Sequence, residues 1–183
     1  MSALTSRVVV IRGADAGEER SLARQAAWRA VRAVIGSDAD VAIRYTKGRA
    51  PLARSYGKRR LWLSLSHRDG RAAAAASRLR QVGIDLERVE RIPVTRARYF
   101  LSEEERRTLG HLPLAVLWCL KESAWKALDL STDVPFHALT LRPGRNRIIR
   151  SVEIGGREIE ASAQVARPWR GWILTLVELE RPR

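Results

Sequence analysis

The sequence predicts an α+β fold on three observations. Two long segments, 18–35 and 114–130, carry apolar residues at helical spacing. Shorter segments such as 61–67 alternate apolar and polar residues with the period of two of a half-buried strand. Beyond Phe136 the chain consists mostly of such strands, separated by Gly and Pro turns that favour antiparallel pairing. Helices combined with largely antiparallel strands define the α+β class.

The first part of the chain is predicted to form strands around one helix. That helix covers 18–35 and ends at Gly36, and its arginines, Arg20 and Arg24 among them, are interpreted as a solvated face. Residues 72–76 are five consecutive alanines, which by propensity alone favour a helix. Strands are expected at 7–12, 41–45 and 61–67.

The second part begins with a predicted strand at 82–87. Ser102 and Glu105 have the spacing of a capping box, which starts a short helix. Pro113 then occupies the first turn of the long helix over 114–130, where proline is well tolerated. Further strands are expected at 138–141, 147–154, 158–165 and 172–178.

Length and composition suit one globular unit. The 183 residues, 45% of them hydrophobic, are enough for one substantial domain or for two small halves packed together, and no linker divides them. No apolar run predicts a membrane span, and the N-terminus lacks a signal-peptide core, so we expect a cytoplasmic protein without a membrane partner. The single cysteine, Cys119, excludes an internal disulfide framework and is interpreted as a buried structural thiol.

The strand at 82–87 carries two carboxylates on one face. Because side chains alternate along a strand, Gly83, Asp85 and Glu87 point to the side opposite the three apolar residues of the segment. Carboxylate oxygens are the ligands that a hard cation such as Mg²⁺ prefers, and the glycine leaves room for a close approach. The alternative is that both acids form a solvated strand end.

A third carboxylate comes from the long helix. Trp118, Glu122 and Lys126 have i, i+4, i+8 spacing and therefore form one stripe. Taken alone, Glu122 and Lys126 also fit an ordinary ion pair on the helix surface. Magnesium sites with a few carboxylates usually leave positions for water and substrate phosphates, so a phosphate-bearing substrate is expected.

The two segments together resemble a known family. The pattern V-G-I-D-L-E, followed by W-x-x-K-E-S-x-x-K at 118–126, resembles the 4′-phosphopantetheinyl transferase family, specifically its surfactin-synthetase-activating type. The resemblance implies two similar α+β halves forming a pseudo-dimer, about 1–80 and 81–183, with the active site in the cleft between them. It also implies transfer of 4′-phosphopantetheine from coenzyme A to a serine of an acyl- or peptidyl-carrier protein, releasing 3′,5′-ADP, with Mg²⁺ as cofactor.

The resemblance assigns roles to individual residues. The metal-binding acids are Asp85, Glu87 and Glu122, and Glu122 is also expected to accept the serine proton. Lys126 is expected to act on the departing phosphate, so the catalytic residues are Glu122 and Lys126. The family's Gly-Lys-Pro element corresponds to Gly48-Arg49-Ala50-Pro51, and its Ser-His pair to 66–67. The coenzyme-binding residues are thus expected to be Arg49, Ser66, His67 and Lys126.

Arg68 departs from the family pattern, and the alanine run at 72–76 is one place where propensity and the resemblance disagree. Arg68 stands where a small hydroxyl residue is common in the family, and an arginine there would either add a phosphate contact or obstruct one. For the alanine run at 72–76 the resemblance predicts a strand that leads into 82–87, and we follow it over helix propensity.

The charge leaves alternatives open. The formal net charge of +14, from 34 Lys and Arg against 20 Asp and Glu, favours polyanionic partners. Coenzyme A and an acidic carrier protein suit this charge, and the carrier is expected to dock near Arg88, Arg91, Arg96 and Arg98. A basic nucleic-acid-binding module is one alternative, although no nucleic-acid motif is present. A catalytically lapsed, carrier-binding member of the fold is the other. We expect a monomer without a nucleic-acid partner.

Overall fold

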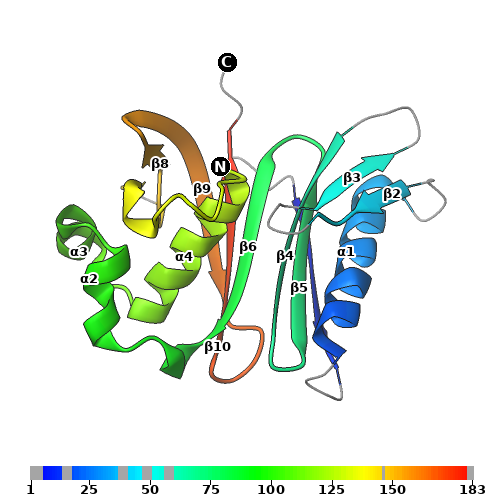
Figure 1. The fold of residues 1–183 in the computed structure, drawn as a ribbon, viewed down its shortest axis with the longest axis horizontal. Coiled ribbons are helices and arrows are strands. Elements are labelled where there is room, and N and C mark those ends of the chain that lie inside the picture. Colours follow the sequence, from blue (N-terminus) through cyan, green and yellow to red (C-terminus); the bar gives the residue numbers. More distant parts are fainter. Residues whose placement is uncertain are drawn as a thin grey trace.

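Two five-stranded antiparallel sheets form the framework of the molecule (Figure 1). The computed structural model describes residues 6–13, 18–36, 41–46, 51–55, 60–145 and 147–180. The strand orders are β1-β5-β4-β3-β2 in the first sheet and β6-β10-β9-β8-β7 in the second. Each sheet comes from one continuous half of the chain and is covered by helices on its outer face. The predicted α+β fold of two similar halves is therefore confirmed.

In its described residues, the first half contains one long helix and five strands. The helix, α1 (Glu19–Ile35), buries Leu22, Ala26 and Ala30 against the first sheet. The predicted helix boundaries and strand positions agree with the structure to within one or two residues. The strands are β1 (Ser6–Arg12), β2 (Val41–Arg44), β3 (Leu52–Ser55), β4 (Arg60–Arg68) and β5 (Arg71–Ser77).

The alanine run lies in β5, as the resemblance predicted. This strand pairs with β1 on one side and β4 on the other. Ala72, Ala74 and Ala76 pack towards α1, whereas Ala73 and Ala75 pack against the second half. Small side chains let a layer approach each face of the strand, so tertiary packing overrides the local helix propensity.

The second half places its helices between strands β6 and β7. The long helix ends at Ala127 rather than at 130, because Asp129 has a left-handed backbone conformation with φ of 52°. None of the helices in the described ranges is long and apolar enough to span a membrane. The elements are β6 (Gln81–Arg88), the 3₁₀ helices η2 (Val89–Arg91) and η3 (Val94–Arg96), α2 (Ala97–Phe100), α3 (Glu103–Leu109), α4 (Leu114–Ala127), η4 (Phe136–Ala138), β7 (Leu139–Arg142), β8 (Ser151–Ile154), β9 (Arg157–Ala166) and β10 (Trp172–Leu179).

The two halves meet between their sheets. An apolar layer joins alternate residues of β5 to those of β6 and β10. Strand β6 is the edge strand of its sheet, and serines of β4 satisfy its outward amides. Ser64 Oγ accepts a hydrogen bond from the amide of Ile84, and Ser66 Oγ accepts one from the amide of Leu86, both at 3.1 Å. The edge is thereby closed by side chains of the other half rather than by another strand.

Candidate functional site

The acids of β6 lie beneath helix α4. The apolar face of β6 packs between the sheets, so Asp85 and Glu87 face α4, where they are only 3% and 4% exposed. The interpretation of these acids as a solvated strand end is therefore wrong. Gly83 allows the close contact, because a Cβ atom there would lie 1.8 Å from the carbonyl oxygen of Ser123. Strand and helix consequently hold their functional side chains at short range.

Replacing Gly83 with alanine should separate these two elements. The added methyl group would overlap the α4 backbone, which cannot move away like a flexible side chain. We expect the free energy of unfolding to fall by about 1–3 kcal/mol or more. Denaturant unfolding followed by circular dichroism measures this change, and an unchanged midpoint would contradict the close packing of α4 on β6.

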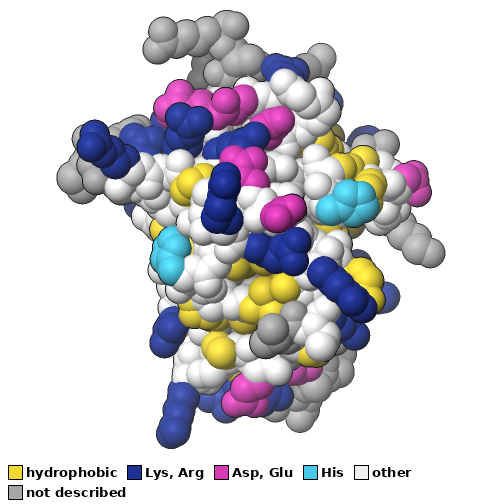
Figure 2. All heavy atoms as spheres, turned by 90° about the vertical axis from the view of Figure 1, so that its left-hand side faces the viewer, with side chains coloured by type: hydrophobic (Ala, Val, Ile, Leu, Met, Phe, Trp, Pro, Cys, Tyr) yellow, Lys and Arg dark blue, Asp and Glu magenta, His cyan; other side chains and the backbone are white. Residues whose placement is uncertain are grey.

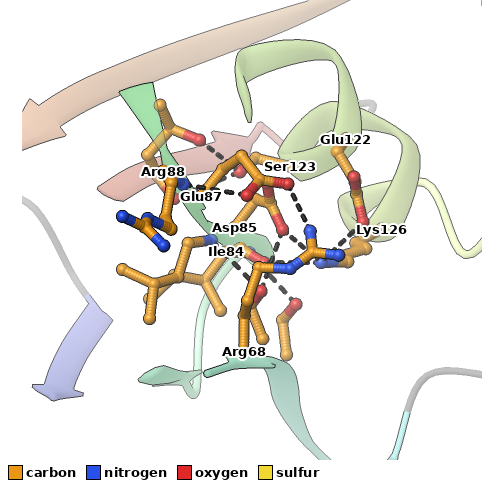
Figure 3. Close-up of polar contacts among 12 residues, drawn as sticks. Arg68, Ile84, Asp85, Glu87, Arg88, Glu122, Ser123 and Lys126 are labelled. Atoms are coloured by element: carbon orange, nitrogen blue, oxygen red, sulfur yellow. Dashed lines mark hydrogen bonds and ion pairs between the residues drawn. The ribbon is translucent and has the colours of Figure 1, made fainter. Parts of the chain in front are cut away.

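Lys126 links Asp85 of the strand to Glu122 of the helix (Figure 3). Its Nζ donates to Asp85 Oδ1 at 2.8 Å and lies 3.2 Å from Glu122 Oε1. Burial alone would lower the pKa of Lys126, but Asp85 and Glu122 outweigh this effect and raise it. The side chain is therefore a firmly protonated ammonium group. Because Lys126 also contacts Asp85, its role is not limited to an ordinary ion pair with Glu122 on the helix surface.

Glu87 is held by a different cation. Its Oε2 forms a close ion pair with the guanidinium of Arg68, and its Oε1 accepts a hydrogen bond from the amide of Arg88 at 2.8 Å. Burial raises the pKa of Glu87, while the Arg88 amide and Arg68 oppose the shift. Both carboxylate oxygens thus have protein partners.

The carboxylates of this site suit a magnesium ion chemically, but they do not form a preformed metal site. Three carboxylates are hard oxygen donors of the kind that Mg²⁺ takes. Within the described ranges, however, no three side chains of the His, Cys, Asp and Glu types are grouped closely enough to hold a metal. Lys126 and Arg68 instead contact the acids, so a metal would have to replace contacts with these cations.

Ser66 and His67 lie on opposite faces of β4. Ser66, 8% exposed, donates from Oγ to Asp85 Oδ1 at 2.9 Å and so holds a predicted metal ligand. His67 faces α1, where its Nδ1 lies 3.3 Å from Glu19 Oε2. Burial by itself would raise the pKa of Glu19, but hydrogen bonds from His67 and Gly70 lower it overall. Sequence reasoning missed Glu19, because an acid in the first turn of a helix is common.

A groove connects His67 to Lys126. Among the residues that the structure describes, strand β3 pairs with residues 60–62 of β4. The groove of about 870 Å³ borders β4 and reaches helix α4. Arg20 and Arg24 line it while remaining exposed, so the predicted solvated face of α1 also borders the groove. Its lining also includes Tyr45, Leu65, Trp125 and Leu130. Arg49 lies outside the described residues.

The other lysine of the helix has a structural position. Lys121 is fully buried and donates to both carboxylate oxygens of Glu105, at 2.9 and 3.0 Å. Glu105 also accepts from the amides of Ser102 and Leu141, so it caps α3 and joins that helix to α4 and β7. Burial raises the pKa of the Cys119 thiol, which is consistent with a structural cysteine and not with a nucleophile.

Fold and site together define a class of protein. Two α+β halves border a groove that Arg20, Arg24 and Lys126 line, and Lys126 contacts the buried Asp85, an arrangement suited to a phosphorylated ligand. The chain belongs to the 4′-phosphopantetheinyl transferase superfamily, whose model matches residues 81–177, 97 of its 183 residues.

Among the solved structures similar to this chain is a carrier-protein synthase. Holo-[acyl-carrier-protein] synthase of Thermotoga maritima is similar, with 24% sequence identity and a TM-score of 0.39. The similarity covers 56% of this chain and 64% of that one, so the chain spans less than two thirds of the length of this neighbour. No curated protein matches the chain.

Proposed function

We propose that this chain transfers 4′-phosphopantetheine from coenzyme A to a serine of an acyl- or peptidyl-carrier protein. The observation that carries this proposal is the groove shared by His67 and Lys126, because Lys126 also contacts two of the three predicted metal ligands. We further propose that the protein is of the surfactin-synthetase-activating type, with residues 1–80 and 81–183 as its two halves. The presence of both sheets in one chain supports this subtype.

The groove would bind the nucleotide end of coenzyme A. Arg20 and Arg24 would supply positive charge along one wall, where His67 adds a ring nitrogen able to form a hydrogen bond, and Lys126 would supply positive charge at the far end. Phosphates bind well to such a set, since arginine offers planar, paired donors and lysine a compact charge. The volume of about 870 Å³ is within the usual range for ligand pockets. We expect Glu19 to hold His67 through Nδ1, leaving Nε2 for the ligand.

The reaction itself depends on positioning and charge. The serine oxygen would attack the phosphorus that bears pantetheine, the pyrophosphate bond would break, and 3′,5′-ADP would leave. Glu122, which is partly exposed, would accept the serine proton. Lys126 would neutralise the departing phosphate, and its raised pKa favours fixed positive charge over proton donation.

Mg²⁺ is the proposed cofactor, held by Asp85, Glu87 and Glu122. When bound, it would neutralise negative charge that develops on the pyrophosphate. Ser66 would keep the Asp85 carboxylate oriented through its 2.9 Å hydrogen bond. This assignment requires that each acid exchange a contact with Lys126 or Arg68 for the metal.

The test is an intact-mass assay with purified protein, coenzyme A, Mg²⁺ and a small panel of apo carrier proteins. The expected result is a gain of roughly 340 Da on a carrier, abolished by a chelator, because the metal is required. Coenzyme A binding without any mass gain would favour the lapsed, carrier-binding alternative. Absence of coenzyme A binding, together with steeply salt-dependent binding to nucleic acid, would favour the nucleic-acid-binding alternative.

The carrier is proposed to dock beside the end of β6. Arg88, Arg96 and Arg98 are exposed there, and the guanidinium of Arg98 lies 4.9 Å from the ring centroid of Tyr99, a residue that is 64% exposed. The side chain of Arg91 lies outside the described residues. In Figure 2, which views the molecule from the side of α2 and α3, Lys and Arg side chains, with Asp and Glu side chains among them, are spread around a hydrophobic area. An acidic carrier with an apolar contact region fits such a surface.

Neutralising Arg96 and Arg98 together, each to glutamine, should weaken carrier docking. We expect kcat/KM for the carrier to fall about tenfold at low salt and its salt dependence to flatten, since screening then has less attraction to remove. The matched control replaces Arg29 and Arg32 of α1 with glutamine and changes the net charge equally. An equal effect in both double variants, or none in the first, would show that docking occurs elsewhere.

A further inference from the structure

Arg68 contacts Glu87, one of the acids of the proposed site. The register of β4 against β6 places these two residues opposite each other. Along β4, alternate residues face β6, and Ser64 and Ser66 accept hydrogen bonds from amides located 20 residues later. The side chains of β4 pair with side chains of β6 in the same way, and each partner lies 19 residues later in the chain. Ser66 donates to Asp85, and Arg68, the next residue on the same face, binds Glu87. The ion pair therefore follows from the register of the two halves and not from a chance surface contact.

The environment of this pair makes it strong. The Glu87 side chain is only 5% exposed, whereas that of Arg68 is 30% exposed. A buried carboxylate needs compensating charge, and a guanidinium supplies it through directed donors. Among the described residues, the ion pairs of the site join three carboxylates to two cations, Lys126 and Arg68. The arginine thus already provides, at Glu87, the positive charge that a divalent metal would otherwise provide.

We propose that Arg68 is an internal competitor for the metal, which makes Glu87 available as a ligand only when the Arg68–Glu87 ion pair opens. This inference rests on the proposed function, because it concerns the same magnesium site. In the ion-paired form, Asp85 and Glu122 are the only acids of the site that Arg68 does not hold. Arg68 therefore sets how tightly the protein binds a divalent cation, and a smaller side chain at this position would remove the competition.

The test measures Mn²⁺ binding to the protein without coenzyme A, from the electron paramagnetic resonance signal of the free ion. Four proteins form a cycle: the original chain, Arg68→Ser, Glu87→Gln, and the double variant. We expect Arg68→Ser to bind Mn²⁺ about tenfold more tightly than the original chain, a coupling of ordinary size. The gain should disappear when Glu87 is already glutamine, since no carboxylate is then released.

The control variant is Arg88→Ser. It removes the same charge one residue from Glu87, but the Arg88 side chain lies 4.0 Å from Asp69 and only its backbone amide bonds to Glu87. A gain as large as that of Arg68→Ser would show that general electrostatics, not competition, sets the affinity. Should Arg68→Ser fail to fold, as judged by circular dichroism, Arg68→Gln takes its place with the same expectation.

The outcomes separate this inference from the proposed function. Equal Mn²⁺ affinity in the original chain and Arg68→Ser, or a gain that persists with Glu87→Gln, overturns the competition but leaves the metal site standing. Failure of every protein in the cycle to bind Mn²⁺ overturns the competition and the proposed metal site together. Tighter binding in Arg68→Ser alone supports the competition.

Discussion

Replacing Glu122 with glutamine is expected to lower the rate of phosphopantetheine transfer by about a thousandfold, the middle of the range for a general acid or base. Glutamine has nearly the same shape but cannot accept the serine proton, and it loses the charge proposed to hold the metal. Glu122 is partly exposed and its ion pair with Lys126 has i, i+4 spacing, so stability should change by less than about 0.5 kcal/mol. A single-turnover mass assay and a thermal melt measure the two effects.

Glu103→Gln provides the matched control for Glu122→Gln. Glu103 is an exposed acid in the first turn of α3, and its replacement makes the same chemical change away from the groove. Transfer by this variant should stay close to that of the original chain. Near-normal transfer by Glu122→Gln, in contrast, would remove Glu122 from its proposed role.

Replacing Lys121 with methionine is expected to produce the largest loss of stability. Lys121 and Glu105 are both 0% exposed, and removing one partner leaves a buried, uncompensated charge. Breaking such a pair costs about 3–5 kcal/mol. In a domain of this size, that loss should lower the melting temperature by on the order of 10 °C. Thermal unfolding followed by circular dichroism measures the shift.

Lys126→Met is the comparison that separates the two lysines of α4. Lys126 lies five residues further along the helix, retains 20% side-chain exposure and borders the groove. Its loss should reduce transfer strongly while destabilising the protein less than Lys121→Met does. At a temperature where both variants are folded, Lys121→Met should retain more transfer activity. A reversed order of the two lysines would contradict this division of roles.

Patterns of local period predicted much of the fold. The alternation of 61–67 and 82–87 identified β4 and β6, and the capping box of Ser102 and Glu105 is present at the start of α3. These succeeded because the period of an element and its cap are local properties. The alanine run of β5 could not be read in this way, since its conformation depends on layers packed against both faces.

The strand faces on which the candidate site residues lie were predictable, but the contacts of these residues were not. The strand period placed Asp85 and Glu87 on one face, and it also implies that Ser66 and His67 diverge. Their partners, however, come from distant parts of the chain: Asp85 binds Lys126, 41 residues away, and His67 binds Glu19, 48 residues away. No local pattern specifies such a pairing, because it depends on how a helix packs on a strand that is remote in the chain, α4 on β6 and α1 on β4.

The sequence by itself determined the α+β class, the acids and lysine that resemble the transferase family, and the faces on which they lie. Only the tertiary structure decided that Lys121 is bound to Glu105 while Lys126 reaches Asp85, and that Arg68 holds Glu87. The physical reason is that the position of a side chain on its own element follows from backbone periodicity. The charge that it meets follows from the packing of elements that are remote in the chain.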